Sequence, residues 1–513
     1  MEFTKSPVSV CEYKKTLRTK TNLEADVIVP DTRPDIVRVL NVKALADVNE
    51  CYMRKDKVIF SGKTKFTILY VGEGDMNKIY SIEYSLPFNH QADMPGADEN
   101  TVPRSLCNVS DTSFDVRNSR KLSVGATLDL CVDAYRGSDI DAISGTGENS
   151  DIPSKSKEYN FDILVASENF EINLSDSLTL PVTEDNCEIF DIDIRPDVSD
   201  IKTVNNKAIV KGNANISVFY SSDGEISTYE TESAFTEIVD INAMQAQQSV
   251  ISSFEVADSS CSTVPSDSGV RLDVDFKLKG NLSAYENKDF IFASDIYSPD
   301  YSYNVKSRKV HLLHIEKCNP FETTVKDTIS LSNSDAQISK IHYMDAMVSC
   351  LSVNKDETCI NLKGNVENVV IYTDEENCLN RKKHTTPFEM QIPCLSKDLN
   401  SSIDAFVSLV SHSFALASSR EIQTRVVVKA NAKLTLMEEV NIITDFSVDQ
   451  TTPIRKNSQA GIVVFYPTKG TDIWAVAKKY NTTCEEIIKI NSLDPSCSTL
   501  GDKPVLIPKR QKS

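Results

Sequence analysis

One pattern recurs three times in this chain of 513 residues and constrains its fold more than any other feature. Three segments align without gaps: DKVIFSGKTKFTILY (56–70), NKAIVKGNANISVFY (206–220) and TCINLKGNVENVVIY (358–372). In each, a glycine is followed eight residues later by a tyrosine, and the glycines lie 150 and 152 residues apart. Self-similarity at a fixed period indicates tandem copies of one structural unit.

Two further sets of segments keep the same phase. FEINLSDSLTL (170–180) matches FETTVKDTISL (321–331), which begins 151 residues later. Alternating runs also begin at Arg120, Val270 and Thr424, roughly 60 residues after each repeat glycine. We therefore interpret residues up to about 448 as a triplication.

The repeats alternate apolar and polar residues, as in Leu272, Val274 and Phe276. A period of two places one face of a strand on a core and the other in water. The glycine inside the first run predicts a β-bulge or a close backbone approach. The predicted fold class is mostly β, with three tandem β-sandwich-like repeats followed by a small α+β (βααβ) domain.

Domain boundaries are placed where the alternation stops. Polar, turn-forming residues predict an exposed linker between the first two repeats and a short tether before the last domain, which would let that domain search for a partner. The predicted division is 1–25 N-terminal segment, 26–136 repeat 1, 137–157 linker, 158–300 repeat 2, 301–448 repeat 3, 449–459 linker and 460–509 C-terminal domain.

Charge separates the C-terminal piece from the rest. The formal net charge is −19, but residues 454–513 hold 10 Lys and Arg against 5 Asp and Glu, which leaves −24 for residues 1–453. An acidic chain is unsuited to unspecific nucleic-acid binding or to adhesion on an anionic membrane. The basic end has two interpretations: ordinary variation between domains, or a recognition module for an acidic partner.

Other segments bear on the compartment. The N-terminus carries charges where an export signal needs an apolar stretch, and no window is apolar enough to span a membrane. Thirteen scattered cysteines without any CxxC favour a reducing cytosol with buried thiols.

Residues 461–508 are predicted to fold as strand, helix, helix, strand. Thr471 or Asp472 is the expected N-cap of the first helix, and Thr483 with Glu486 forms a capping box for the second. The inner faces of the two helices are Ile473, Val476, Ala477 and Tyr480, and Cys484, Ile487 and Ile488.

This segment resembles a LysM domain in GTDIWAVAKKY (470–480), IKINSLD (488–494) and LGDKPVLIP (500–508). In LysM domains that bind N-acetylglucosamine polymers, the loops beside the helices form the glycan groove, and the order Gly-Thr-Asp here departs from the usual Gly-Asp-Thr. The sole tryptophan, Trp474, is either a packing residue of the small core or a partly exposed anchor at an interface. The resemblance implies a partner-binding surface made of Gly470, Thr471, Asp472, Ile473, Trp474, Asn491, Leu493 and Asp494.

The whole layout resembles the clostridial spore-coat morphogenetic proteins of the SipL type, whose repeats are called SPOCS domains. The resemblance rests on the Gly-x7-Tyr strands, on VIVPDTRPDIVRVL (27–40) and on the LysM-like end. It implies a non-enzymatic scaffold in the mother-cell cytoplasm, at the forespore surface and in the spore coat. There it would bind the coat-basement ATPase, a self-polymerising morphogenetic protein, through the LysM domain, and would contact other coat proteins or further copies of itself. The alternative is a peptidoglycan-binding protein of the spore cortex or cell wall.

No catalytic, cofactor or metal site is expected. His311 and His314 lie three apart in an alternating segment, so their side chains would point to opposite faces. Acidic clusters such as Asp191, Asp193 and Asp197 are predicted to lie on a solvated strand face or in turns. An enzyme acting on wall or coat polymers has no supporting set of residues.

Overall fold

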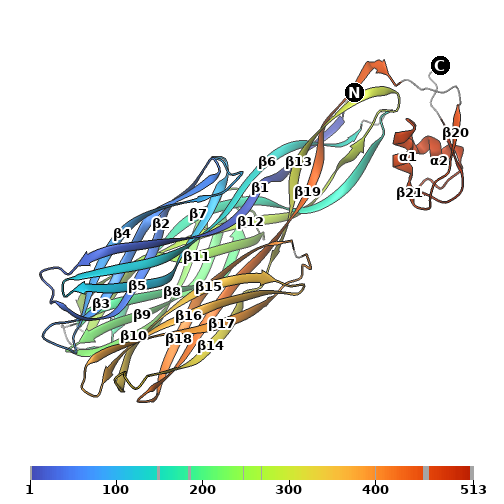
Figure 1. Ribbon diagram of the computed structural model, residues 1–513. Helices are drawn as coiled ribbons and strands as arrows, with labels where there is room; N and C mark the ends of the chain where they lie inside the picture. Colours follow the sequence, from blue (N-terminus) through green and yellow to red (C-terminus); the bar gives the residue numbers. More distant parts are fainter. Residues whose placement is uncertain are drawn as a thin grey trace.

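The computed structural model describes residues 3–146, 151–182, 187–246, 248–266, 269–398, 400–454 and 461–508. These residues form β-strands almost throughout, with two short helices near the C-terminus (Figure 1). The mostly-β prediction is confirmed. Within the described residues, no helix is both long and apolar enough to cross a membrane.

The strands fall into three units of similar layout and a C-terminal domain. The first unit contains β1 (Phe3–Ile28), β2 (Ile36–Arg54), β3 (Lys57–Gly72), β4 (Ile79–Asp93), β5 (Val102–Asn118) and β6 (Lys121–Thr146). The second contains β7 (Ser154–Leu180), β8 (Cys187–Val204), β9 (Lys207–Ser222), β10 (Glu225–Asp240), β11 (Ser249–Ser266) and β12 (Gly269–Ile296). The third contains β13 (Tyr301–Lys317), β14 (Phe321–Ser330), β15 (Ile338–Lys355), β16 (Cys359–Asp374), β17 (Leu379–Pro393), β18 (Ser402–Ser418) and β19 (Glu421–Pro453). The C-terminal domain contains β20 (Ile462–Phe465), β21 (Thr471–Asp472), α1 (Ile473–Lys479), α2 (Cys484–Ile490), β22 (Thr499–Leu500) and β23 (Val505–Pro508).

Each unit packs one antiparallel layer against another. The strand orders β2–β3–β4, β8–β9–β10 and β15–β16–β17 are separate three-stranded sheets. The facing layers are β1–β6–β5, β7–β12–β11, and β13 and β14 on one side of β19 with β18 on the other. One large apolar core lies between the two layers of each unit, because alternation turns every second side chain inward.

The repeated glycine marks a close approach between strands. Gly62 lies opposite Phe88 of β4, and a Cβ added to it would be 2.1 Å from the Asp47 carbonyl oxygen and 2.8 Å from the Phe88 ring. Gly212 with Phe235, and Gly364 with Phe388, repeat this arrangement. The neighbouring strands β2, β8 and β15 each bulge just beside the glycine. The bulge and the close approach predicted for this position are both present.

In the first and third units, the repeated tyrosine ties the central strand to the loop that leads into the neighbouring strand, β2 or β15. Tyr70, Tyr220 and Tyr372 are buried. The hydroxyl of Tyr70 donates to the carbonyl of Pro34 at 3.1 Å, and that of Tyr372 donates to the carbonyl of Ala336 at 3.3 Å. A buried tyrosine hydroxyl needs such a partner, which fixes the loop against the sandwich.

Six strand segments run beyond the sandwiches and form what we call the stem: residues 3–11, 137–146, 154–166, 284–296, 301–317 and 433–453. They converge at the end of the molecule opposite the sandwiches (Figure 1). Two apolar clusters hold the stem together, one centred on Phe161 and Phe292 and one on Ile296 and Phe446. Each of the three units contributes two of the segments.

The stem replaces two predicted connections. Residues 137–157 were expected to be an exposed linker, yet β6 continues to Thr146 and β7 begins at Ser154. Residues 3–25, expected to precede the first repeat, belong to β1, and 449–453 of the expected tether belong to β19. Pairing with distant strands, such as Val8 with Ile140, supplies hydrogen bonds that local composition does not reveal. Residues 455–460 and 509 lie outside the described part of the chain.

The three units meet one another in a cyclic arrangement. The strand β2 contacts β11 and β17, β8 contacts β18 and β4, and β15 contacts β5 and β10, so each unit touches the other two through equivalent strands. An apolar cluster drawn from all three units lies at the junction: Leu40, Leu69, Val71, Ile79, Phe190, Phe219, Ile226, Tyr343, Ile371 and Leu379.

Candidate functional site

The predicted partner surface is built on the C-terminal domain. The short strands β21 and β22 pair through Thr471 and Leu500, and the Gly470 amide donates to the Leu500 carbonyl at 2.9 Å. Gly470 has φ +89°, a conformation suited to glycine. The loop before α1 therefore lies beside the loop that follows α2.

The helices form as the sequence predicts. Asp472 caps α1 by accepting the Trp474 amide at 3.0 Å, and Thr483 with Glu486 makes the capping box of α2. Ile473 is 1% exposed and lies in the core of the domain, so its side chain does not reach the surface. Its place in the predicted partner surface is therefore that of a supporting residue.

The residues after α2 mainly hold the domain together. The side-chain amide of Asn491 donates to the carbonyls of Ile487 and Leu506 at 2.8 and 2.6 Å, and its oxygen accepts the Leu506 amide at 2.7 Å. Leu493 is half-buried against the core. Asp494 is exposed and accepts the backbone amide and the hydroxyl of Ser496, bonds that lower the pKa of its carboxyl.

Trp474 makes both kinds of contact considered for it, with the core of its own domain and with another part of the chain. It packs against the core of the C-terminal domain, and its ring meets Tyr297 edge-on with centroids 5.0 Å apart. Its indole Nε1 donates to Asp295 Oδ2 at 2.8 Å. Asp295 and Tyr297 lie at the end of the stem, about 180 residues earlier in the chain. Sequence reasoning missed both, because nothing local marks a strand end as a docking point.

An apolar strip on the same domain was also missed. Ile462, Val464 and Leu506 are 49%, 50% and 38% exposed, and the pairing of Val464 with Leu506 puts all three on one face of the β20–β23 sheet. Tyr466, 74% exposed, follows β20 directly. The alternation of this strand could have revealed the strip, because the inner face is already supplied by Val463 and Phe465.

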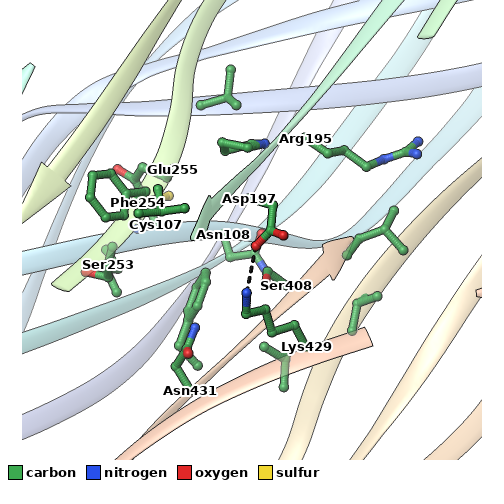
Figure 2. A pocket seen from close by; sticks show the side chains of 18 of the residues that line it. Cys107, Asn108, Arg195, Asp197, Ser253, Phe254, Glu255, Ser408, Lys429 and Asn431 are labelled. Carbon is green, nitrogen blue, oxygen red and sulfur yellow. Dashed lines mark hydrogen bonds and ion pairs between the residues drawn. The ribbon is translucent and has the colours of Figure 1, made fainter. Parts of the chain in front are cut away.

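A second candidate site is a cavity of about 820 Å³ where the three units meet. Its lining comes from all three units, and Figure 2 shows Asp197 of the second unit bonded to Lys429 of the third. The two side chains are 2.6 Å apart. The equivalent pair between the first and second units is Asp47 with Lys279.

Buried charge is concentrated around Lys43. Its Nζ lies 2.7 Å from Asp191 Oδ2, 3.3 Å from Asp193 Oδ1 and 3.9 Å from Asp345 Oδ1. Burial disfavours the ammonium ion, but these carboxylates outweigh it and raise the pKa of Lys43 well above its usual range. The prediction that Asp191 and Asp193 face solvent is therefore wrong. Packing between units, which the sequence pattern of one strand cannot show, covers that face.

Asp193 also pairs with Arg195, whose Nη1 meets His412 Nδ1 of the third unit. Burial, reinforced by the Arg195 charge, lowers the pKa of His412 to about 4. A second centre is Asp133 of the first unit, which accepts Lys14 and, at 2.8 Å, Lys433 of the third unit. The pair of Lys433 with Asp133 crosses the boundary between units, whereas Asp193 with Arg195 and Lys14 with Asp133 each lie within one unit.

Two other groups in the cavity wall are uncharged. Burial raises the pKa of Glu255 to about 8, so its carboxyl is protonated at neutral pH, and it accepts the Cys107 amide at 2.8 Å. Burial also raises the pKa of Cys107 well above its usual range, which keeps the thiol protonated and unreactive. Among the described residues, no group of three or more His, Cys, Asp or Glu side chains is placed to hold a metal ion. The cavity is best explained as the polar core of the junction between units.

Comparison with known proteins bears on the strands that build these units. The family model described as SipL, SPOCS domain, matches residues 35–117 and 187–264. The two ranges cover equivalent strands, β2 to β5 in the first unit and β8 to β11 in the second. No curated protein matches the chain.

Among solved structures, the ferric yersiniabactin uptake receptor FyuA from Yersinia pestis aligns with 85% of this chain and 81% of its own. The identity is 10% and the TM-score is 0.11, a likeness that supports no conclusion about fold or function. The family match, in contrast, shows similarity to the SPOCS domain of SipL in two regions of the chain.

Proposed function

We propose that this protein is a non-enzymatic morphogenetic scaffold of the spore coat. Its three β units form the body, and its LysM-type C-terminal domain binds the coat-basement ATPase at the forespore surface in the mother-cell cytoplasm. The observation that carries the proposal is the match of two regions to the SPOCS domain of SipL. That match covers two of the three units. The third repeat, the tandem arrangement and the LysM assignment rest on the sequence resemblance alone.

The character of the C-terminal domain supports the binding role. Its net charge is positive, +5 over residues 454–513, whereas the rest of the chain has a net charge of −24. It also holds the half-buried Trp474 and an exposed apolar strip that includes Val464. Aromatic anchors and contiguous apolar surface are typical of protein-binding sites.

The body is suited to holding a shape. Buried ion pairs such as Lys43 with Asp191 join the units, and two buried groups of the cavity wall, Glu255 and Cys107, are protonated and uncharged. An arrangement of this kind fixes the three units relative to one another, which is what a scaffold requires.

The test is capture of the purified coat-basement ATPase by the full-length protein. Val464→Asp, which places a charge on the exposed strip, and Trp474→Ala should each lower capture at least about tenfold, the effect of losing a hot-spot residue. Lys489→Ala, on an exposed residue of α2, is the matched control. In sporulating cells, a fluorescent fusion ending at Ile454 should lose its position at the forespore surface. Undiminished capture by both variants, together with normal placement of the truncated fusion, would refute the proposal.

Binding of peptidoglycan is the second candidate, and one observation favours it. The loop at Gly470 is joined through the β21–β22 pairing to the segment that follows α2, and loops in these two positions flank the glycan groove in LysM domains. Co-sedimentation with purified peptidoglycan, abolished by Thr471→Ala with Asp494→Ala but not by Val464→Asp, would favour this function over ATPase binding.

A further inference from the structure

The C-terminal domain rests against the end of the stem through the face that holds Trp474. Asp295, at the end of β12, accepts Trp474 Nε1 and also pairs with Lys478, whose Nζ lies 2.7 Å from Oδ1 and 2.9 Å from Oδ2. One carboxylate therefore holds two side chains on adjacent turns of α1. Figure 1 shows the domain beside the far end of the stem.

Two further contacts surround this carboxylate. Tyr297 is 1% exposed, and besides meeting the Trp474 ring it donates its hydroxyl to the Thr482 carbonyl at 2.7 Å. Lys155 Nζ, from β7, lies 3.0 Å from Asp472 Oδ2, on the carboxylate that caps α1. The stem thus contacts Asp472 and Trp474, two of the residues predicted for the partner surface.

The strength of these contacts suits a reversible attachment. The side chains of Lys155 and Asp472 are 46% and 42% exposed, and those of Lys478 and Asp295 are 38% and 32% exposed. Ion pairs this exposed each contribute about 0–1 kcal/mol. The buried Tyr297 ring adds one apolar contact to these ion pairs. Domains of one chain move relative to one another by default unless their interface is large and hydrophobic.

We propose that the stem blocks the Trp474 face of the C-terminal domain, so that a protein partner using this face must first displace Asp295. This inference rests on the proposed function, because it assigns that face to the partner. The displacing partner needs the chemistry that it replaces: a carboxylate for Trp474 Nε1 and Lys478, beside an aromatic or apolar surface in place of Tyr297. Gly470 and Asp494, in the loops that flank the glycan groove of LysM domains, make no hydrogen bond to the stem among the described residues, whereas Asp472 of the first loop pairs with Lys155.

The first test needs no partner. Trp474 is the only tryptophan of the chain, so its emission reports docking directly. Asp295→Ala in the full-length protein should shift the emission to longer wavelength as the indole gains water, whereas Asp445→Ala should not. Asp445 is a matched control because it also forms an exposed ion pair on the stem, with Lys306. An unchanged emission in Asp295→Ala would overturn the proposal.

The second test measures binding of the purified coat-basement ATPase to the same full-length variants. Asp295→Ala should tighten binding about fivefold to twentyfold, because the stem no longer competes with the ATPase for the Trp474 face. Asp445→Ala should leave binding unchanged. Equal or weaker binding by Asp295→Ala, when Trp474→Ala abolishes binding, would overturn the block but keep the proposed function. Undiminished binding by Trp474→Ala would instead remove the assigned partner face, and the proposed block with it.

Discussion

At the scale of single residues, the repeated glycine is the most constrained position in each unit. At Gly62 a Cβ would meet a backbone oxygen, and backbone cannot move aside as a flexible side chain can. Gly62→Ala should therefore lower the free energy of unfolding by about 1–3 kcal/mol, the usual range for overpacking. Denaturant unfolding measures this loss.

The control for that substitution is Gly145→Ala, which has no atom within 4 Å of the added Cβ. It should change stability by less than about 0.5 kcal/mol, as surface substitutions usually do. Equal effects at the two positions would mean that the close approach of Asp47 and Phe88 does not require a glycine at position 62.

Glu255 makes a prediction about pH. The carboxyl has a pKa of about 8 in the folded protein against 4.5 as its ordinary value. Between these values the folded state holds a proton that the unfolded state has released, so a rise in pH favours unfolding. Glu255→Gln removes this effect while its amide oxygen can still accept the Cys107 amide.

The stability gained by Glu255→Gln should therefore grow from pH 5 to pH 8, by an amount on the order of 2–4 kcal/mol. Urea unfolding of both proteins at the two pH values measures the gain. A gain that stays constant across this range would show that the Glu255 carboxyl is ionised in the folded protein.

At the scale of the elements, the sequence predicted the features that depend on a local residue pattern. Alternation identified the strands, the capping box at Thr483 identified the second helix, and Gly62 identified a bulge. The sequence did not predict the stem, because residues 137–146 resemble a linker until they pair with β1. Nor did it predict the burial of Asp191, since alternation reports which residues share a strand face but not whether another unit covers that face.

The stem can be tested at one of its aromatic contacts. Phe292 is 1% exposed and stacks on Tyr159 with ring centroids 4.2 Å apart. Phe292→Ala should lower the free energy of unfolding by about 3–5 kcal/mol, as expected for a buried phenylalanine. Ile291→Ala is the matched control, because the adjacent side chain points outward and is 58% exposed. A linker without tertiary packing would give equal, small losses for both.

At the scale of the whole molecule, the three units behave as one body only if the junction between them is stable. The apolar cluster containing Leu40, Phe219 and Ile371 stabilises the contact between the units, but apolar packing does little to specify their relative orientation. Ion pairs specify this orientation, because a buried charge is tolerated only opposite its partner. The pairs from Lys43 reach Asp191 in the second unit and Asp345 in the third, so a single side chain in the first unit specifies the positions of both neighbours.

Lys43→Met should therefore disturb more than its own strand. It leaves Asp191, Asp193 and Asp345 buried without their shared cation, and removing one partner of a buried pair typically lowers stability by about 3–5 kcal/mol. Lys63→Met, at a pair with Asp258 that also joins two units but is 44% exposed on both sides, should lower it by about 0–1 kcal/mol. Hydrogen exchange should then accelerate together in β2, β8 and β15 for Lys43→Met. If only β2 loses protection, the units are independent domains joined in series, and the junction does not hold the scaffold in one shape.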